Sequence, residues 1–430
     1  MTSLESSNAR NRQPRRGIEN DWVVLIVGIL VAYALVDSLY VGIPVFQRAL
    51  FGLLLLGTMV AAAATAARVR LGSREMTYLV AMFAVLIGGS VGILTQSILY
   101  PFYILGDLAS IGLLGLFLIF GLATSKSLFS GKAIVVLWGA CLIGSILSPL
   151  IGVENGRFDP PSPFLIGVTV GFAIAAPRRS GTFAAVCVLF IIVLLAYKSG
   201  FRTHVALAMV GAFVALGRLM GPRIWLSGLV VLCAIAVVNA PSIGRYLASQ
   251  AVVSESRFQD LSTGEADQSV LERSLEVKDA WVSARDGWSK YQWFVGAGHG
   301  ATYIPVESNI IRNIMRENRV HNIHVGPMLV LYRYGFLGIA ALMLLVVVTV
   351  RQSWSQFFQK HGTTSVVNVF PWVLLFYLAD FLVRNVMIDP FFAYAVAGLA
   401  AGHRGNARIG SRQGKYEIDR LSRHVASGST

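Results

Sequence analysis

Charged residues are scarce in this sequence, since Lys, Arg, Asp and Glu together make up 13% of its 430 residues. A soluble globular domain carries roughly 25% charged residues, and a chain with half that share has too little polar material to cover a water-exposed surface. Hydrophobic residues account for 55%. This balance excludes an ordinary soluble enzyme and a disordered protein, and it favours a chain with many membrane-spanning segments.

Cysteine is also rare, and Cys141, Cys187 and Cys233 each lie inside an apolar run. Three cysteines at such positions do not form a disulfide framework, so we expect small buried residues. No close group of His and Cys resembles a zinc site, and no carboxylate cluster resembles a magnesium site. The sequence therefore predicts neither a metal nor a cofactor.

Long apolar runs, by contrast, are abundant, and about 20 apolar residues suffice to cross a bilayer as a helix. We expect a transmembrane helix in each of twelve runs: 22–43, 49–67, 77–98, 104–123, 133–152, 162–176, 182–197, 203–219, 223–240, 325–350, 367–387 and 390–402. Together they predict an all-α polytopic membrane protein.

The basic residues indicate the orientation, because cytoplasmic loops of membrane proteins carry an excess of Lys and Arg. Alternate connections, counted with both termini, hold 21 basic residues, and the short connections on the other side hold four. We therefore expect both termini in the cytoplasm. The basic residues behind the net charge of +14 lie between the apolar runs. They therefore indicate orientation in a lipid bilayer, and we expect no nucleic-acid partner.

One outer connection is much longer than the others and rich in aromatic residues, unlike a disordered linker, so we expect it to be folded. Apolar residues recur at helical spacing over 270–289, which predicts an amphipathic helix lying over the membrane domain. The expected organisation is a cytoplasmic tail 1–21, transmembrane helices in 22–240, an extracytoplasmic loop region 241–324, transmembrane helices in 325–402 and a basic cytoplasmic tail 403–430.

Cationic and imidazole side chains gather near the outer ends of these helices. Arg202 lies in the turn between the seventh and eighth helices, and Arg273 lies in the large loop. His299 lies in a glycine-rich segment, and His321 begins the sequence His-Asn-Ile-His just before the tenth helix. Further candidate site residues, in chain order, are Asn322, His324, Arg333, Asp380 and Arg384.

These residue types suit the binding of a phosphorylated ligand. A guanidinium holds phosphate oxygens through paired donors, so Arg202 and Arg273 could hold a diphosphate. The glycines around His299 would let backbone amides approach an anion closely. A histidine can take a proton from an attacking hydroxyl near neutral pH. Without a metal, arginine would have to neutralise the leaving group.

Each candidate also has an ordinary structural explanation that the sequence leaves open. Arg202 could anchor a helix end at the membrane interface, and Arg273 could form a surface pair with a neighbouring glutamate. The glycines could form only a turn. Asp380 and Arg384, spaced i,i+4 on one helical face, could neutralise each other inside the bundle. The shared side and the order of these features, more than any one of them, indicate a site.

In this order the features resemble those of the O-antigen ligase and O-antigen polymerase superfamily of bacterial envelope glycosyltransferases. The similarity covers about a third of the chain. The positions that resemble the family's motifs are the turn Ser199-Gly200-Phe201-Arg202, Arg273 with Trp281, the glycine-rich segment from Phe294 to Gly300, and His321-Asn322 with the downstream segment from Tyr334 to Gly338.

The resemblance implies a metal-independent, inverting membrane glycosyltransferase of the helical, GT-C-like class in a bacterial inner membrane. Such an enzyme transfers a glycan from undecaprenyl diphosphate to an acceptor hydroxyl at the outer face. It implies that Arg202 and Arg273 bind the diphosphate and that His321 is the base, with His299 or His324 as alternatives. It does not separate a ligase from a polymerase, whose acceptors differ.

Two other functions stay open at this point. A flippase or transporter for a lipid-linked glycan would bind the same headgroup without chemistry, although the sequence shows no internal repeat of the kind many transporters have. A structural membrane subunit would have no site, and the cationic residues would then be incidental.

Overall fold

The computed structural model describes most of the helical part of the chain. The described residues are 14–38, 44–66, 73–96, 99–151, 160–176, 178–199, 201–220, 268–305, 319–321, 323–358, 369–382, 384 and 389–402. The helix predicted at 223–240, the tail 403–430, Asn322 and Cys233 lie outside them, as does the part of the large loop before residue 268.

The described residues are almost entirely α-helical, and the only extended pairing among them is one antiparallel bridge between Tyr303 and Val320. The helices are α2 (Pro14–Ser38), α3 (Pro44–Thr65), α4 (Ser73–Ile93), α5 (Pro101–Leu128), α6 (Gly131–Ile151), α7 (Pro163–Ala175), α8 (Arg179–Lys198), α9 (Arg202–Met220), α11 (Gln268–Gly287), α12 (Lys290–Val295), α14 (Gly326–Phe358), α15 (Phe370–Phe381) and a last described helix over Pro390–Gly402. The all-α prediction is confirmed for this part of the chain, and α11 is the helix predicted over 270–289.

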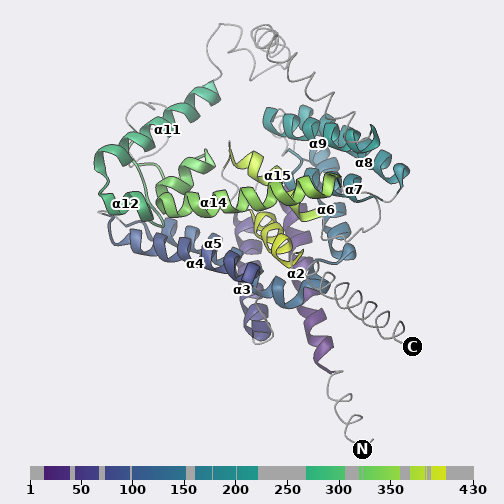
Figure 1. Cartoon of the computed structure of the whole chain (residues 1–430), viewed down its shortest axis with the longest axis horizontal. Helices are drawn as coiled ribbons and strands as arrows, with labels where there is room; N and C mark the ends of the chain where they lie inside the picture. The colour runs from purple at the N-terminus through teal and green to yellow at the C-terminus, as the bar shows by residue number, and fades with distance from the viewer. Residues whose placement is uncertain are drawn as a thin grey trace, which may run out of the picture.

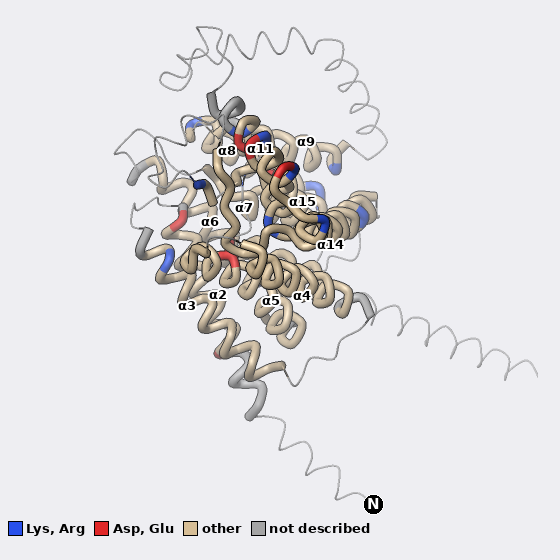
Figure 2. Tube along the Cα trace, turned by 90° about the vertical axis from the view of Figure 1, so that its left-hand side faces the viewer, with Lys and Arg blue, Asp and Glu red and all other residues tan. Residues whose placement is uncertain are grey.

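Seven described helices are long and apolar enough to cross a membrane. They cover Phe46–Thr65, Met76–Ile93, Pro101–Thr124, Gly131–Pro149, Arg179–Lys198, Thr203–Met220 and Gly326–Phe358. Three more apolar helices, α7, α15 and Pro390–Gly402, are shorter. The protein is therefore a multi-pass membrane protein, and long stretches of its helices carry no charged residue (Figure 2).

The outward-facing surface of these helices is apolar, as a lipid environment requires. Leu56, Ile87 and Leu194 lie on three different candidate spans, and each is more than half exposed. A water-facing surface does not gather such side chains in number. These apolar surfaces therefore indicate that lipid surrounds the helices.

The helices differ in how closely they approach one another. In Figure 1, α11 and α12 lie at one end of the molecule, and α4, α5 and α14 extend away from them. α7 and α15 approach each other closely, since a Cβ added at Gly167 would run into the backbone of Val373. Small residues let membrane helices pack backbone to backbone, where dispersion forces act over the shortest distance.

Local sequence explains where several helices begin and end. Pro101 opens α5, at a position where its missing N–H costs nothing. Ser162 caps α7 by accepting a hydrogen bond from the N–H of Leu165. Ser289 and Gln292 form a reciprocal capping box at the start of α12. These residues set the positions at which α5, α7 and α12 begin.

The long helix α14 is broken at Gly335, whose φ of 60° and ψ of −155° are not helical. The loop that follows α12 fills the break. Ala297 donates its N–H to the carbonyl of Tyr332 at 2.8 Å, and Gly298 donates to the carbonyl of Arg333 at 2.9 Å. A helix break leaves backbone carbonyls without their usual hydrogen-bond donors, which costs free energy in a membrane. The N–H groups of the loop supply these donors.

Some predicted boundaries are wrong. The helix expected over 77–98 ends at Ile93, and the helix expected over 325–350 continues to Phe358. The run 367–387 forms a helix only to Phe381. There, the hydroxyl of Tyr377 donates to Asp389 at 2.7 Å, which holds the chain ahead of the last described helix. Apolar composition does not reveal this polar contact, so the prediction placed the end of the helix too far along the chain.

The expectation of buried cysteines holds for only one of the two that the structure describes. Cys141 on α6 is buried, whereas Cys187 on α8 is exposed. An apolar run is consistent with either position, because a membrane helix is apolar on its lipid-facing side as well as on its packed side. The side that a cysteine occupies depends on helix packing, which the run does not specify.

We predict that Gly298→Ala destabilises the fold. Gly298 has a φ of +92°, and a Cβ there would run into the backbone of Gly92 and Ile93. The left-handed backbone alone should cost about 1–3 kcal/mol, so thermal unfolding in detergent should occur at a lower temperature. Gly139→Ala on α6 is the matched control, because nothing lies within 4 Å of its added Cβ. Equal unfolding temperatures for the two variants would contradict the tight docking of the loop.

Candidate functional site

A buried carboxylate on α5, that of Asp107, organises one end of the bundle. Its Oδ1 accepts a hydrogen bond from Nη1 of Arg333 at 2.5 Å, and its Oδ2 accepts one from the N–H of Gly300 at 2.8 Å. The side chains of Asp107 and Arg333 are each only 5% exposed. Because charge-assisted hydrogen bonds are the strong ones, this contact ties α5, α14 and the loop after α12 to one another.

His321 lies against this ion pair. Its Nε2 is 2.9 Å from Nη2 of Arg333, and its Nδ1 is 3.2 Å from the carbonyl oxygen of Ala301. The ring stacks on that of Tyr103, with centroids 4.1 Å apart and planes at 1°. Since a guanidinium only donates and a carbonyl only accepts, Nε2 is the acceptor and Nδ1 carries the proton. Both ring nitrogens of the predicted base are thus engaged with protein groups.

The imidazoles of His299 and His321 both have a lowered pKa. Burial lowers the pKa of His321 to about 4, and the charge of Arg333 lowers it as well. Burial also lowers the pKa of His299 to about 4, against a hydrogen bond with the Leu86 carbonyl that raises it. His299 is fully buried, with its ring against that of Tyr334. It therefore reaches no ligand at the surface in this structure.

The glycine-rich segment does not present free amides to a ligand. The N–H groups of Gly296, Ala297, Gly298, His299, Gly300 and Ala301 all donate to acceptors within the protein. The expectation that these amides approach an anionic ligand is therefore wrong in this structure. The one anion that the segment binds is the protein's own Asp107, through the N–H of Gly300.

A second polar group lies where α9 begins and α15 ends. Nη1 of Arg384 is 3.0 Å from Nε2 of His204, and Nε of Arg384 is 3.7 Å from Oδ2 of Asp380. Asp380 is fully buried, and neither of its oxygens accepts a hydrogen bond from any group in the described part of the chain. Arg273 on α11 has a weaker electrostatic effect on Asp380 than Arg384 has. Arg202 is the first residue of α9, and its side chain lies outside the described residues.

Asp380 and Arg384 form the predicted ion pair, but they do not share a helical face. Asp380 is in the last turn of α15, but the helix ends at Phe381 and Arg384 lies beyond it. The N–H of Arg384 nevertheless donates to the carbonyl of Asp380 at 2.9 Å, and the two side chains form an ion pair. The guanidinium is 40% exposed while the carboxylate is fully buried, so the positive end faces outward.

His324 forms a third contact, with Glu276 of α11. Nδ1 of His324 lies 3.1 Å from Oε1 of Glu276, and the backbone N–H of His324 donates to Oε2 at 3.0 Å. The carboxylate side chain is 2% exposed, whereas the imidazole is 59% exposed. Glu276 lies three residues after Arg273, which places the two on neighbouring turns of one helix face.

The second and third groups meet at the start of α14. A Cβ at Gly326 would run into the ring and carbonyl of Phe381, the residue after Asp380. His324 precedes Gly326 by two residues, so it lies beside the end of α15. The structure thus places Asp380 and Arg384 against His204 in the first turn of α9, with the start of α14 packed on the end of α15. Arg333 and His299 are buried beside Asp107 and Tyr334, and the less buried His321 lies against Arg333.

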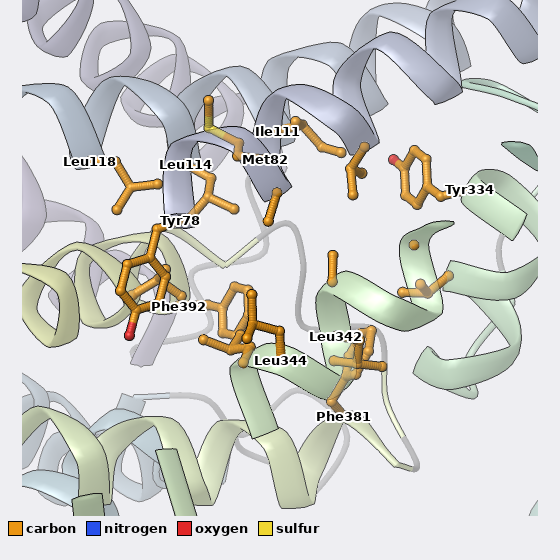
Figure 3. Close-up of a pocket in the computed structure, with 17 residues that line it drawn as sticks. Tyr78, Met82, Ile111, Leu114, Leu118, Tyr334, Leu342, Leu344, Phe381 and Phe392 are labelled. Atoms are coloured by element: carbon orange, nitrogen blue, oxygen red, sulfur yellow. The ribbon is translucent and has the colours of Figure 1, made fainter. Parts of the chain in front are cut away.

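An apolar pocket of about 120 Å³ lies between α4, α5, α14, α15 and the last described helix. Figure 3 shows side chains such as Met82, Leu114 and Leu342 directed into it, with Tyr334 at one end of the view. Tyr334 follows Arg333 in the chain, and the lining residue Phe381 follows Asp380. The pocket therefore begins beside the polar residues.

Sequence reasoning missed Asp107, and it gave Glu276 and His204 no role of their own, with Glu276 considered only as a surface partner of Arg273. A signal existed for Asp107, because it is the only charged residue in the predicted span 104–123, and an isolated charge inside a membrane helix needs a partner. Glu276 had no distinguishing signal among the many charges of the large loop. His204 lies in the predicted span 203–219 and was passed over for the neighbouring Arg202.

Comparison of the chain with models of known protein families and with curated proteins finds no match. A function for this site has therefore to be inferred from the chemistry of its own residues. The described ones comprise two exposed or partly exposed arginines, an imidazole–carboxylate pair and an adjacent apolar pocket.

We predict that Asp107→Asn lowers the stability of the protein strongly. Removing one partner of a buried ion pair leaves the other charge uncompensated and costs about 3–5 kcal/mol, so the unfolding temperature in detergent should fall. Asp286→Asn is the control, because Asp286 forms an ion pair with Arg285 in which both side chains are more than half exposed. Loss of stability in the control alone would show that Asp107 does not tie the segments together.

Stability should also fall as the pH drops from about 6.5 to 4. His321 has a pKa of about 4 in the folded protein, against an ordinary value of 6.5. Between these values the unfolded chain binds more protons than the folded one, so stability is complete above pH 6.5 and decreases toward pH 4. Unfolding temperatures of the wild type and of His321→Gln should differ in this pH dependence. Parallel curves would mean that His321 is not held neutral.

Proposed function

We propose that this protein is an envelope glycosyltransferase, a polysaccharide ligase or polymerase, that transfers a glycan from undecaprenyl diphosphate to an acceptor hydroxyl. The observation that carries the proposal is an apolar pocket lined by Phe381, the residue after Asp380, whose ion-pair partner Arg384 is partly exposed, within a membrane protein. The resemblance of Arg202, Arg273 and His321 to positions of the O-antigen ligase and polymerase superfamily supports the same function.

The polar end of the site suits a diphosphate. Arg384 is 40% exposed, and its fork of five N–H donors offers more hydrogen bonds than its contacts with His204 and Asp380 use. Arg273 is partly exposed on α11, and Arg202 begins α9, two residues before His204. A guanidinium presents paired donors to phosphate oxygens, which suits a doubly charged headgroup.

The apolar end suits a long hydrocarbon chain. The pocket is lined almost only by aliphatic and aromatic side chains from helices that span the membrane. The first isoprene units of the tail in this pocket, with the rest of the chain in the bilayer, would place the headgroup near Phe381, the residue after Asp380. A soluble sugar nucleotide has no apolar part to occupy the pocket, so a lipid-linked donor is the better fit.

The chemistry follows from this placement. The acceptor oxygen attacks the anomeric carbon, the bond from that carbon to the diphosphate oxygen breaks, and the electron pair leaves with the lipid diphosphate. Fixed arginines stabilise the negative charge on the leaving group without reorganisation. A histidine base accepts the hydroxyl proton. Attack from the face opposite the leaving group inverts the configuration, and arginine takes the place of a divalent metal.

The finer organisation belongs to the same proposal. We place twelve transmembrane helices in a bacterial inner membrane, in a GT-C-like arrangement with both termini in the cytoplasm. The ends where α9 and α14 begin then face outward, together with the loop region 241–324. A lipid-linked glycan at the outer leaflet would reach the arginines from that side, with its tail remaining in the bilayer.

We predict that Arg273→Ala weakens donor binding in a reconstituted assay with an undecaprenyl-diphosphate glycan. Hydrogen bonds to charged groups contribute about 1.5–3 kcal/mol, so the donor KM should rise on the order of 10- to 100-fold. Release of lipid diphosphate and formation of a new glycosidic bond are measured together. Arg202→Ala should act in the same direction, and EDTA should leave the rate unchanged.

Arg285→Ala is the matched control, since Arg285 lies on the same helix but is exposed and paired with Asp286. It should leave the donor KM unchanged. Translocation of the donor without bond formation would replace the proposal with a flippase. Strong inhibition by EDTA would contradict a mechanism that relies on arginine alone.

A further inference from the structure

Aromatic side chains from α11, α12 and α14 gather on one exposed surface of the protein. The ring of Trp293 on α12 lies against that of Trp281 on α11, with centroids 5.4 Å apart, and against that of Phe336 on α14, at 6.0 Å. Trp281 and Phe336 are both exposed, and Trp293 between them is partly exposed. Three helices therefore contribute rings to one continuous group.

Two more residues extend this group along α12. Tyr291 and Phe294 are spaced i,i+3, so they lie on one side of the helix, and each is about half exposed. A Cβ at Gly335 would run into the carbonyl of Phe294, so Phe294 lies beside the residue that precedes Phe336. A contiguous group of exposed, large apolar side chains marks an interaction site. We call it the aromatic surface, and its members are Trp281, Tyr291, Trp293, Phe294 and Phe336.

The aromatic surface continues the lipid-facing surface of the membrane helices. Phe336 belongs to the candidate span Gly326–Phe358, on which Met343 is also more than half exposed. The side-chain amide of Gln292 on α12 donates to the hydroxyl of Thr95 at 3.2 Å, just beyond the end of α4. Leu94, the neighbour of Thr95, is 85% exposed. Exposed apolar side chains therefore extend from α4 and α14 onto α12, at the end of the molecule where Figure 1 shows α11 and α12.

Charged residues lie on the other side of the aromatic surface. Arg285 and Asp286, near the end of α11, form an ion pair in which both side chains are more than half exposed. Lys290, the first residue of α12, is exposed as well. A bilayer shows the same change over a short distance, from acyl chains to headgroups and water. Trp and Tyr favour that boundary, because each combines an apolar ring with a polar group.

We propose that α12 and the adjoining end of α11 lie in the membrane interface, with the aromatic surface inserted among the lipids of the nearer leaflet. In the orientation proposed above, this is the outer leaflet. Aromatic rings also stack on sugars, but continuity with the lipid-facing sides of α4 and α14 favours lipid. The contact is independent of the glycosyltransferase activity.

Insertion would also position the loop that follows α12. Gly300 in that loop donates its N–H to Asp107, and Ala297 and Gly298 donate to carbonyls at the break in α14. Because α12 leads directly into this loop, lipids that hold α12 at a fixed depth would hold these contacts in place as well. The bilayer would then support the buried contact of Asp107 with Arg333 from outside.

Spin labels test the depth of α12 in the full-length protein, reconstituted in phosphatidylcholine vesicles. A nitroxide is attached at Phe294→Cys, in a background that has alanine in place of the three native cysteines. Its collision rates are measured with oxygen, which concentrates among acyl chains, and with a nickel chelate, which stays in water. Met343→Cys gives the reference for lipid, and Asp286→Cys gives the reference for water. The oxygen-to-nickel ratio at Phe294→Cys should be several-fold higher than at Asp286→Cys and close to that at Met343→Cys.

Tryptophan fluorescence gives a second measurement on protein without a label. Phospholipids brominated on their acyl chains quench tryptophans that lie close to them. The quenched fraction should be smaller in Trp281→Phe than in the wild type, because an exposed ring of the aromatic surface is removed. Trp372→Phe is the matched control, since Trp372 is only 4% exposed. It should not reduce the quenched fraction.

Three results would overturn the inference. A ratio at Phe294→Cys equal to that at Asp286→Cys would place the aromatic surface in water, where its partner would be a soluble molecule such as a glycan. A label that neither oxygen nor nickel reaches would mean that another part of the protein covers the surface. An unchanged quenched fraction in Trp281→Phe would show that acyl chains do not approach the ring of Trp281.

Discussion

The contact between Asp107 and Arg333 is the interaction on which this end of the molecule depends. The carboxylate reaches residues 193 and 226 positions further along the chain, Gly300 and Arg333. A charge buried in a membrane bundle is unfavourable unless it is paired and hydrogen-bonded. The arrangement that pairs it also places α5, α14 and the loop after α12. A single electrostatic requirement thereby fixes the geometry of three segments.

The same contact shows how differently the three histidines near it are held. His321 lies against Arg333, and His299 is buried with its ring against Tyr334. His324, three residues after His321, is 59% exposed and contacts Glu276 of α11. Neighbouring positions of one segment therefore place their imidazoles in different surroundings, and the sequence alone does not show which is buried.

Much of the architecture could be predicted from the sequence, because lipid imposes a simple rule on composition and length. The apolar runs gave the class of fold, and helical spacing gave α11. The break at Gly335 could not be predicted, since it depends on N–H donors from Ala297 and Gly298, which are distant in sequence. For the site, the arginines were identified by residue type, and the structure pairs Arg384 with Asp380. The sequence offered Glu276 only as a surface partner of Arg273, because its burial against His324 is not visible in a polar loop sequence.

The bridge between Tyr303 and Val320 links the backbone on both sides of the His321 ring. Its two hydrogen bonds, at 3.0 and 2.8 Å, hold Val320 against the segment that contains Ala301, and His321 follows Val320 directly. The carbonyl of Ala301 in turn lies 3.2 Å from Nδ1 of His321. Backbone pairing and side-chain contact therefore fix the same short stretch of chain twice, so a substitution that moved Tyr303 would also displace the imidazole from Arg333.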